Sequence, residues 1–121
     1  MKFNHTELGI EGEKYACEQL ISKGYTLLSR NYRWNRAEID LVMKDKDRIV
    51  FIEVKTRNTA VFGKPYEAVT KSKQKQLIKA ANAYIQEKEV QEEARFDVVS
   101  IVWNSHGISM EHLKDAFYPS L

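Results

Sequence analysis

The sequence has little of what builds disulfide-rich, zinc-binding or membrane proteins. It contains one cysteine, Cys17, which excludes an internal disulfide and a cysteine-rich zinc site. Its histidines, at positions 5, 106 and 112, lack the spacing of a zinc ligand set. No apolar run approaches the length of a transmembrane helix, and residues 1–5 lack the apolar segment of a signal peptide. We therefore expect a cytoplasmic protein that does not bind membranes.

What is present is typical of one globular domain. A chain of 121 residues has the length of a single domain, so we predict one domain over residues 1–121. Hydrophobic residues make up 43% and charged residues 30%, which is ordinary for a globular protein. The net charge of +2 permits a nucleic-acid partner without requiring one.

A β-hairpin over residues 38–55 is the centre of the prediction, because two β-branched apolar runs flank a polar turn. Pairing that is symmetric about Lys46 and Asp47 places Asp40 opposite Glu53 and Glu38 opposite Lys55. Alternation predicts one wholly apolar face and one face with every charge. The apolar face would hold Ile39, Leu41, Met43, Val50, Ile52 and Val54.

Two carboxylates that face each other repel unless a cation lies between them, so Asp40 and Glu53 suggest a metal site. The alternative is a solvated sheet face with a Glu38–Lys55 ion pair. The hairpin alone leaves both open.

A helix is predicted from its N-cap Thr6 to Lys23. Glu13 lies on the apolar stripe of this helix, where a carboxylate needs a partner. That partner is either an arginine or backbone amide, or a metal ion. Gly9 and Gly12 are poor helix formers that suit a close approach of the backbone to another element.

The rest of the chain alternates strands and one further helix. Strands are predicted over residues 25–32, 95–103 and 108–112, and a helix over 71–89 with Thr70 as its cap. Residues 56–69 form a long loop in which Phe62 and Tyr66 either pack beneath the loop or contact a nucleic acid. Phe117 and Tyr118 are expected to dock on the core. This order predicts an α/β or α+β domain with helices packed on a mixed sheet.

Two groups of cations are candidate phosphate contacts, although a solvated surface is the commoner role of such groups. The first surrounds Trp34 in a polar turn at residues 33–36, and the second is a row on the second predicted helix. The groups are Arg30, Arg33 and Arg36, and Lys71, Lys73, Lys75 and Lys79.

Several ordered motifs resemble a known family. They are Gly9-x-x-Gly12-Glu13-x-x-Ala16, Arg30-Asn31-Tyr32-Arg33, Glu38-Ile39-Asp40-Leu41, Phe51-Ile52-Glu53-Val54-Lys55-Thr56-Arg57 and Arg95-Phe96-Asp97-Val98-Val99. Together they are similar to the YraN-like family of small bacterial proteins. Asp40 followed by Glu53-Val54-Lys55 resembles the PD-(D/E)XK nuclease superfamily, and the YraN-like family is itself similar to archaeal Holliday-junction resolvases.

The resemblance implies a restriction endonuclease-like α-β-β-β-α-β core and a role for each matched residue. Asp40, Glu53 and the Val54 carbonyl would bind Mg²⁺ or Mn²⁺, Glu13 would complete the site, and Lys55 would orient or deprotonate the attacking water. Arg57 joins the two cation groups as a further expected DNA contact. The sequence departs from the pattern in having Ile39 in place of the superfamily's proline and Ala37 in place of a glycine common in the family.

These observations lead to one principal hypothesis about function. We expect a magnesium- or manganese-dependent nuclease that hydrolyses DNA phosphodiesters at branched or damaged structures, and a homodimer is compatible with cutting two strands. The main rival is a non-catalytic module that binds nucleic acid or protein and retains the fold. A glycosidase with paired carboxylates is a third reading, but Lys55 beside the pair counts against it.

Overall fold

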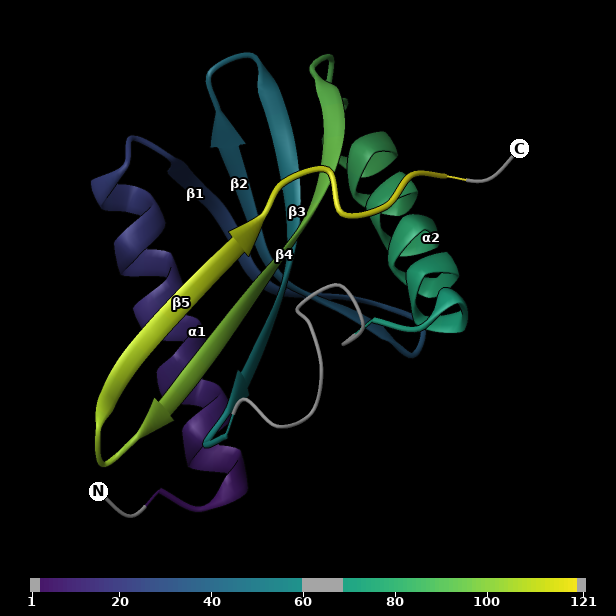
Figure 1. Ribbon diagram of the computed structural model, residues 1–121. Coiled ribbons are helices and arrows are strands. Elements are labelled where there is room, and N and C mark those ends of the chain that lie inside the picture. Colours follow the sequence, from purple (N-terminus) through teal and green to yellow (C-terminus); the bar gives the residue numbers. More distant parts are fainter. Residues whose placement is uncertain (1–2, 60–68, 120–121) are drawn as a thin grey trace.

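In the computed structural model, residues 3–59 and 69–119 are described, and they form two helices and a five-stranded sheet (Figure 1). The elements are α1 (His5–Ser22), β1 (Thr26–Trp34), β2 (Ala37–Asp45), β3 (Arg48–Arg57), α2 (Lys71–Glu87), β4 (Glu93–Asn104) and β5 (Gly107–Leu113). Every predicted helix and strand is present, with its ends shifted by a few residues.

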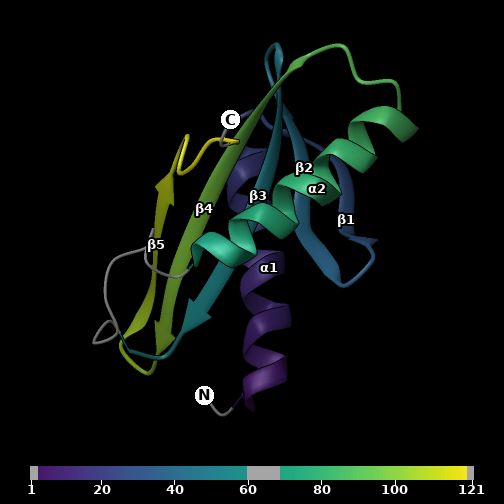
Figure 2. The same ribbon diagram turned by 90° about the vertical axis from the view of Figure 1, so that its right-hand side faces the viewer.

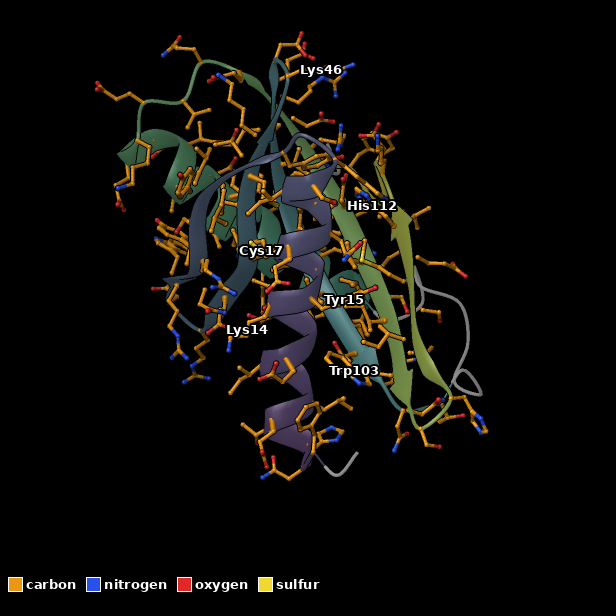
Figure 3. The ribbon with its side chains drawn as sticks, turned by 90° about the vertical axis from the view of Figure 1, so that its left-hand side faces the viewer. Lys14, Tyr15, Cys17, Lys46, Trp103 and His112 are labelled. Atoms are coloured by element: carbon orange, nitrogen blue, oxygen red, sulfur yellow. The ribbon has the colours of Figure 1, made fainter. Side chains whose placement is uncertain are left out.

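The strands lie in the sheet in their sequence order, β1-β2-β3-β4-β5. All neighbours are antiparallel except β3 and β4, which are parallel and joined by α2. Such a parallel connection needs a crossover, which α2 supplies. The helix lies in front of the sheet in Figure 2, whereas α1 covers the opposite face in Figure 3. The fold is therefore α/β, with the predicted α-β-β-β-α-β arrangement of a restriction endonuclease-like core.

The first helix begins two residues earlier than predicted. Asn4, not Thr6, is the N-cap, and its side chain accepts a hydrogen bond from the Glu7 backbone N–H while the Glu7 side chain accepts one from the Asn4 N–H. This capping box satisfies two amide groups that the helix cannot pair internally. At the other end Gly24 has φ +100°, a left-handed conformation that favours glycine.

The sheet carries an apolar core on each face. The α1 side buries Leu41, Met43, Val50 and Ile52 with Ala16 and Leu20 of the helix. On the α2 side Val42, Phe51, Val98 and Ile39 pack with Leu77 and Tyr84. Alternation along β2 is therefore broken between Ile39 and Leu41, and the prediction that they share a face was wrong. The break falls at Asp40.

The predicted hairpin register is correct where β2 and β3 pair. Leu41 lies opposite Ile52 and Asp45 opposite Arg48, so the turn is at Lys46 and Asp47. The β1–β2 turn is tighter than predicted, since Trp34 pairs with Ala37 and only Asn35 and Arg36 lie between them.

The C-terminal segment docks through one of its two aromatic residues. Phe117 is buried and stacks on Phe96, with 5.1 Å between ring centroids. Tyr118 is exposed, so the expectation that it docks was wrong. Phe62 and Tyr66 of the predicted loop lie outside the described residues.

A buried ionic network ties the hairpin to the C-terminal half of the chain. Arg95 contacts the carboxylates of Asp97 and Asp45 and donates to the Tyr25 hydroxyl, at 2.8–2.9 Å. Asp97 also contacts His112 Nε2 at 2.7 Å. Every charged group of this network therefore has a partner, and we assign the network a role in stability.

Neither helix is long and apolar enough to span a membrane.

Candidate metal centre

Acidic side chains from α1 and β2 meet at one edge of the α/β core. Glu13, Glu38 and Asp40 each bring one carboxylate oxygen within 4.8 Å of the others. The first helix therefore carries Glu13 to Asp40, as the sequence predicted. Oxygen ligands of this kind suit Mg²⁺ or Mn²⁺ and not soft metals.

Asp40 and Glu53 are the buried members of the site, 8% and 6% exposed. Both carboxyl groups line one cavity, and the Glu53 carboxyl acts on that of Asp40, so the two lie on the same side of the sheet, as predicted. Burial first, and then the neighbouring Glu53 carboxyl, raise the pKa of Asp40 far above its usual range. The Val54 backbone N–H, which donates to Asp40 Oδ2 at 2.8 Å, partly offsets this by favouring the charged form.

Lys73 supplies the cation that faces this pair. It lies in the first turn of α2, and its ammonium contacts Glu53 Oε2. Although partial burial opposes its charge, the carboxylates of Glu53, Asp40 and Glu38 raise the pKa of Lys73. One ammonium from α2 therefore offsets part of the negative charge of the acidic site.

The other two carboxylates are held from β1. Asn31, which has φ 51°, donates from Nδ2 to Glu13 at 2.9 Å and to Glu38 at 3.2 Å. Arg33 Nε lies 2.9 Å from Glu38 Oε2. Within the parts of the chain that the structure describes, Glu13 is hydrogen-bonded by the Asn31 side-chain amide and by neither an arginine nor a backbone amide.

Gly12 brings the helix close enough for Glu13 to reach this site. A Cβ atom at Gly12 would lie 1.8 Å from Thr56 Oγ1 on β3, so only glycine allows this approach. A Cβ at Gly9 would meet nothing within 4 Å. The close approach predicted for the two glycines is confirmed for Gly12 and wrong for Gly9.

Lys55 does not join the described acidic group. It is exposed and lines a separate depression with His5, Leu8 and Arg57. Within residues 3–59 and 69–119 it has no ion pair, and the Glu38–Lys55 pair expected from the register is replaced by Arg33–Glu38. The physical reason is that β2 pairs with β3 only from Leu41 to Asp45, so Glu38 and Lys55 are not held opposite each other.

The expected nucleic-acid-binding residues divide among several places. Arg36 lines a cavity of about 220 Å³ with Glu38, Asp40, Glu53 and Lys73. Arg30 and Arg33 are on β1, Arg57 is at the end of β3, and Lys71 and Lys75 line a depression on α2 together with Lys79. Lys73 points instead to Glu53, so the lysine row is not one surface.

Sequence reasoning missed the parts played by Asn31, Glu38 and Lys73. Asn31 lies inside the Arg30-Asn31-Tyr32-Arg33 motif, which was the available signal. Lys73 could not be distinguished from its neighbours on α2, because only the packing of the helix on the sheet brings one lysine to Glu53.

Comparison with known proteins places these residues in a family. The model of "Uncharacterised protein family UPF0102" matches residues 12–101. A UPF0102 protein of Christiangramia forsetii is 43% identical over 114 residues, covering 94% of this chain and 96% of that protein. One of Chlorobium phaeobacteroides is 44% identical over 124 residues, covering 97% and 98%. The chain therefore belongs to the UPF0102 family, the YraN-like family that its motifs resemble.

Proposed function

We propose that this protein is a divalent-metal-dependent endonuclease that hydrolyses DNA phosphodiester bonds at branched or damaged structures. The observation that carries the proposal is the convergence of Glu13, Glu38 and Asp40 within 4.8 Å, with Glu53 against Asp40. Four carboxylates from three elements, two of them buried, are costly to assemble without a cation.

The donor set fits a hard divalent ion. Mg²⁺ binds oxygen at about 2.0–2.1 Å, so two of its ligands can be at most about 4.2 Å apart. Oxygen atoms spread over as much as 4.8 Å would need a small inward movement, or would hold the ion partly through water. Both are ordinary for magnesium, which usually keeps several water ligands.

The residues have distinct roles in this proposal. Asp40 and Glu53 hold the ion, with the Val54 carbonyl, and Glu13 completes the site directly or through water. Glu38 also contributes to holding the ion, and its contacts with Arg33 and Asn31 offset part of its negative charge. A bound Mg²⁺ or Mn²⁺ would lower the pKa of a water molecule bound to it and offset the negative charge on the phosphate oxygens. The water oxygen would form a new bond to phosphorus as the bond between phosphorus and the leaving oxygen breaks, and the proton that the water gives up would be balanced by one taken up by the leaving oxygen.

Two lysines can supply the ammonium that the reaction needs. Lys55 holds the position implied by the superfamily, while Lys73 contacts Glu53. We propose that Lys73 occupies part of the cation position when no metal is bound and turns to a phosphate oxygen when the ion replaces it. Its flexible four-carbon stem allows this movement.

A cleavage assay tests the proposal on single-stranded, linear duplex and four-way DNA, with Mg²⁺, with Mn²⁺ and with a chelator. We expect metal-dependent cutting that Asp40→Asn abolishes. Comparing Lys55→Ala with Lys73→Gln identifies the lysine that supports cleavage. Arg48→Gln, on the far end of the hairpin, is the matched control and should cut like the wild type. Absence of metal-dependent cutting on all three substrates would refute the nuclease.

One observation favours a second function, a binding module without catalysis. Lys55 is exposed and outside the cavity that holds the acidic pair, and Lys73 already neutralises Glu53. Tight binding of DNA with no cutting, unchanged by Asp40→Asn, would support the module.

A further inference from the structure

A groove beside the acidic cavity combines an exposed indole with unpaired cations. Its lining residues are Trp34, Asn35, Arg36 and Ala37 from the β1–β2 turn, and Gln76 and Lys79 from α2. Its volume is about 420 Å³, within the range of ligand clefts. None of these lining residues is acidic, in contrast to the cavity next to it.

Trp34 is not needed to cover the core. It is 37% exposed and belongs to neither apolar cluster of the described residues. The other tryptophan, Trp103, packs against Phe3 and Tyr15, with ring centroids 5.5 and 5.9 Å away. Trp103 and Tyr15 are labelled in Figure 3. Packing thus explains Trp103 and leaves the surface of Trp34 unexplained.

The cations of the groove are available for an anion. Neither Arg36 nor Lys79 forms an ion pair within residues 3–59 and 69–119, whereas Arg33 and Lys73 are paired with Glu38 and Glu53. Two cations without a carboxylate partner among the described residues therefore line the groove together with the exposed indole.

The groove and the acidic cavity follow one another beneath the same helix. Both are lined by Arg36, Ala37 and Gln76. On α2, Gln76 is three residues from Lys73, which lines the cavity, and three residues from Lys79, which lines the groove, so Gln76 links the two hollows. In Figure 1 the β1–β2 turn lies on the α2 side of the sheet, at the lower right. A chain of phosphates can pass from one to the other.

We infer that this groove binds an unpaired nucleotide next to the phosphate held at the acidic cavity, with its base stacked on Trp34 and its phosphates on Arg36 and Lys79. This rests on the proposed function and narrows its substrate. A base inside a continuous duplex is already stacked on its neighbours, so the groove selects single strands, flaps and branch points. DNA and RNA single strands share this chemistry.

Binding is measured without catalysis, in a chelator, by two methods. In the first, Trp103→Phe leaves Trp34 as the only fluorescent indole, and oligo-dT is expected to quench it. In the second, labelled oligo-dT, oligo-rU, a flap and a blunt duplex are titrated with the wild type, Trp34→Ala, Trp34→Phe and Leu28→Ala. The second method keeps the test intact if Trp103→Phe does not fold. Leu28 is an exposed apolar residue on the same strand and serves as the control.

We expect Trp34→Ala to weaken oligo-dT and flap binding roughly 5- to 100-fold, the range for loss of one stacked base. Trp34→Phe should retain part of the affinity, and Leu28→Ala all of it. The same dependence on Trp34 with oligo-rU would extend the subsite to RNA. Arg36→Gln and Lys79→Gln should weaken every substrate and each lower the salt slope by about one.

The inference is overturned if oligo-dT leaves Trp34 fluorescence unchanged, or if Trp34→Ala weakens the blunt duplex as much as the single strand. Metal-dependent cleavage without any change in Trp34 fluorescence would refute the nucleotide-binding groove and leave the proposed nuclease standing. Quenching of Trp34 fluorescence without cleavage would refute the nuclease and leave the nucleotide-binding groove standing.

Discussion

Replacement of Asp40 by asparagine should stabilise the metal-free protein near neutral pH. Burial and Glu53 raise the pKa of Asp40 to about 10, so the folded protein holds this carboxyl protonated near pH 7 and must take up a proton on folding, whereas asparagine needs none. The asparagine side-chain oxygen can still accept the hydrogen bond from the Val54 N–H, 2.8 Å away in the wild type. The hydrogen bond is kept, and folding no longer has to take up a proton at this position.

The size of the effect follows from proton linkage. A carboxyl whose folded pKa is raised contributes stability below its unfolded pKa, and that contribution is lost as pH rises toward the folded pKa. With an unfolded pKa of about 3.9 and 1.36 kcal/mol per unit, the loss near pH 7 is at most about 4 kcal/mol. Water entering the cavity and the nearby Lys73 ammonium reduce this, so we expect a gain of about 1–3 kcal/mol.

Urea unfolding at several pH values, in a chelator and then in excess magnesium, measures this gain. The difference between Asp40→Asn and wild type should vanish near pH 4 and grow with pH. Magnesium at about a hundred times its dissociation constant should add about 2.7 kcal/mol to the wild type and little to the variant. Asp47→Asn, in the exposed β2–β3 turn, is the control. An Asp40→Asn protein less stable than wild type throughout this range would refute the reasoning.

Three further predictions concern stability and metal affinity. Lys73→Gln should lower the metal-free stability by about 1–2 kcal/mol, which is less than the cost of breaking a fully buried ion pair because the lysine is half-exposed. The same substitution should tighten Mn²⁺ binding measured by calorimetry. An unchanged affinity would contradict the proposal that the metal ion displaces Lys73. Gly12→Ala should lower the free energy of unfolding in urea by about 1–3 kcal/mol through overpacking against Thr56. Gly9→Ala should leave it unchanged or raise it by up to about 1 kcal/mol. Equal effects of the two substitutions would contradict the close approach of α1 to β3 at Gly12. Burial opposes the charge of Asp97, but its hydrogen bonds with His112 and Arg95 outweigh this and lower the pKa of Asp97, so its stabilisation is present above the unfolded pKa and lost in acid. Asp97→Asn should therefore lose about 2–4 kcal/mol near pH 7 and less at low pH, and a loss independent of pH would exclude the charge as the cause.

Much of the fold was predictable because its signals are local. Alternation in the hairpin, the spacing of apolar residues in α2 and its cap at Thr70 each depend on residues within a few positions of one another. The turn at Lys46 and Asp47 fixed the pairing of Leu41 with Ile52. The N-cap of α1 was misplaced because Asn4 and Thr6 are both favourable caps, and the capping box of Asn4 with Glu7 decides between them.

The candidate site was predictable in part. The sequence placed Asp40 opposite Glu53 and brought Glu13 toward them, because the face of a strand and the face of a helix follow from periodicity. It could not place Glu38 in the acidic group or foresee that Lys73, and not Lys55, contacts Glu53. Those outcomes depend on where β2 separates from β3. The separation occurs next to Asp40, whose side chain accepts a hydrogen bond from the Val54 N–H, and no local sequence pattern specifies it.

The sequence by itself determined the order of the elements, the two apolar faces of the sheet in outline, and the acids available to the site. Tertiary structure alone decided which cation meets those acids and which aromatic residue stays exposed beside them. Lys73 and Trp34 are each ordinary members of a surface pattern. Only the packing of α2 across the sheet selects Lys73 from four lysines and opens a groove at Trp34. The first contact joins residues 20 positions apart and the second residues more than 40 apart, which no local pattern specifies.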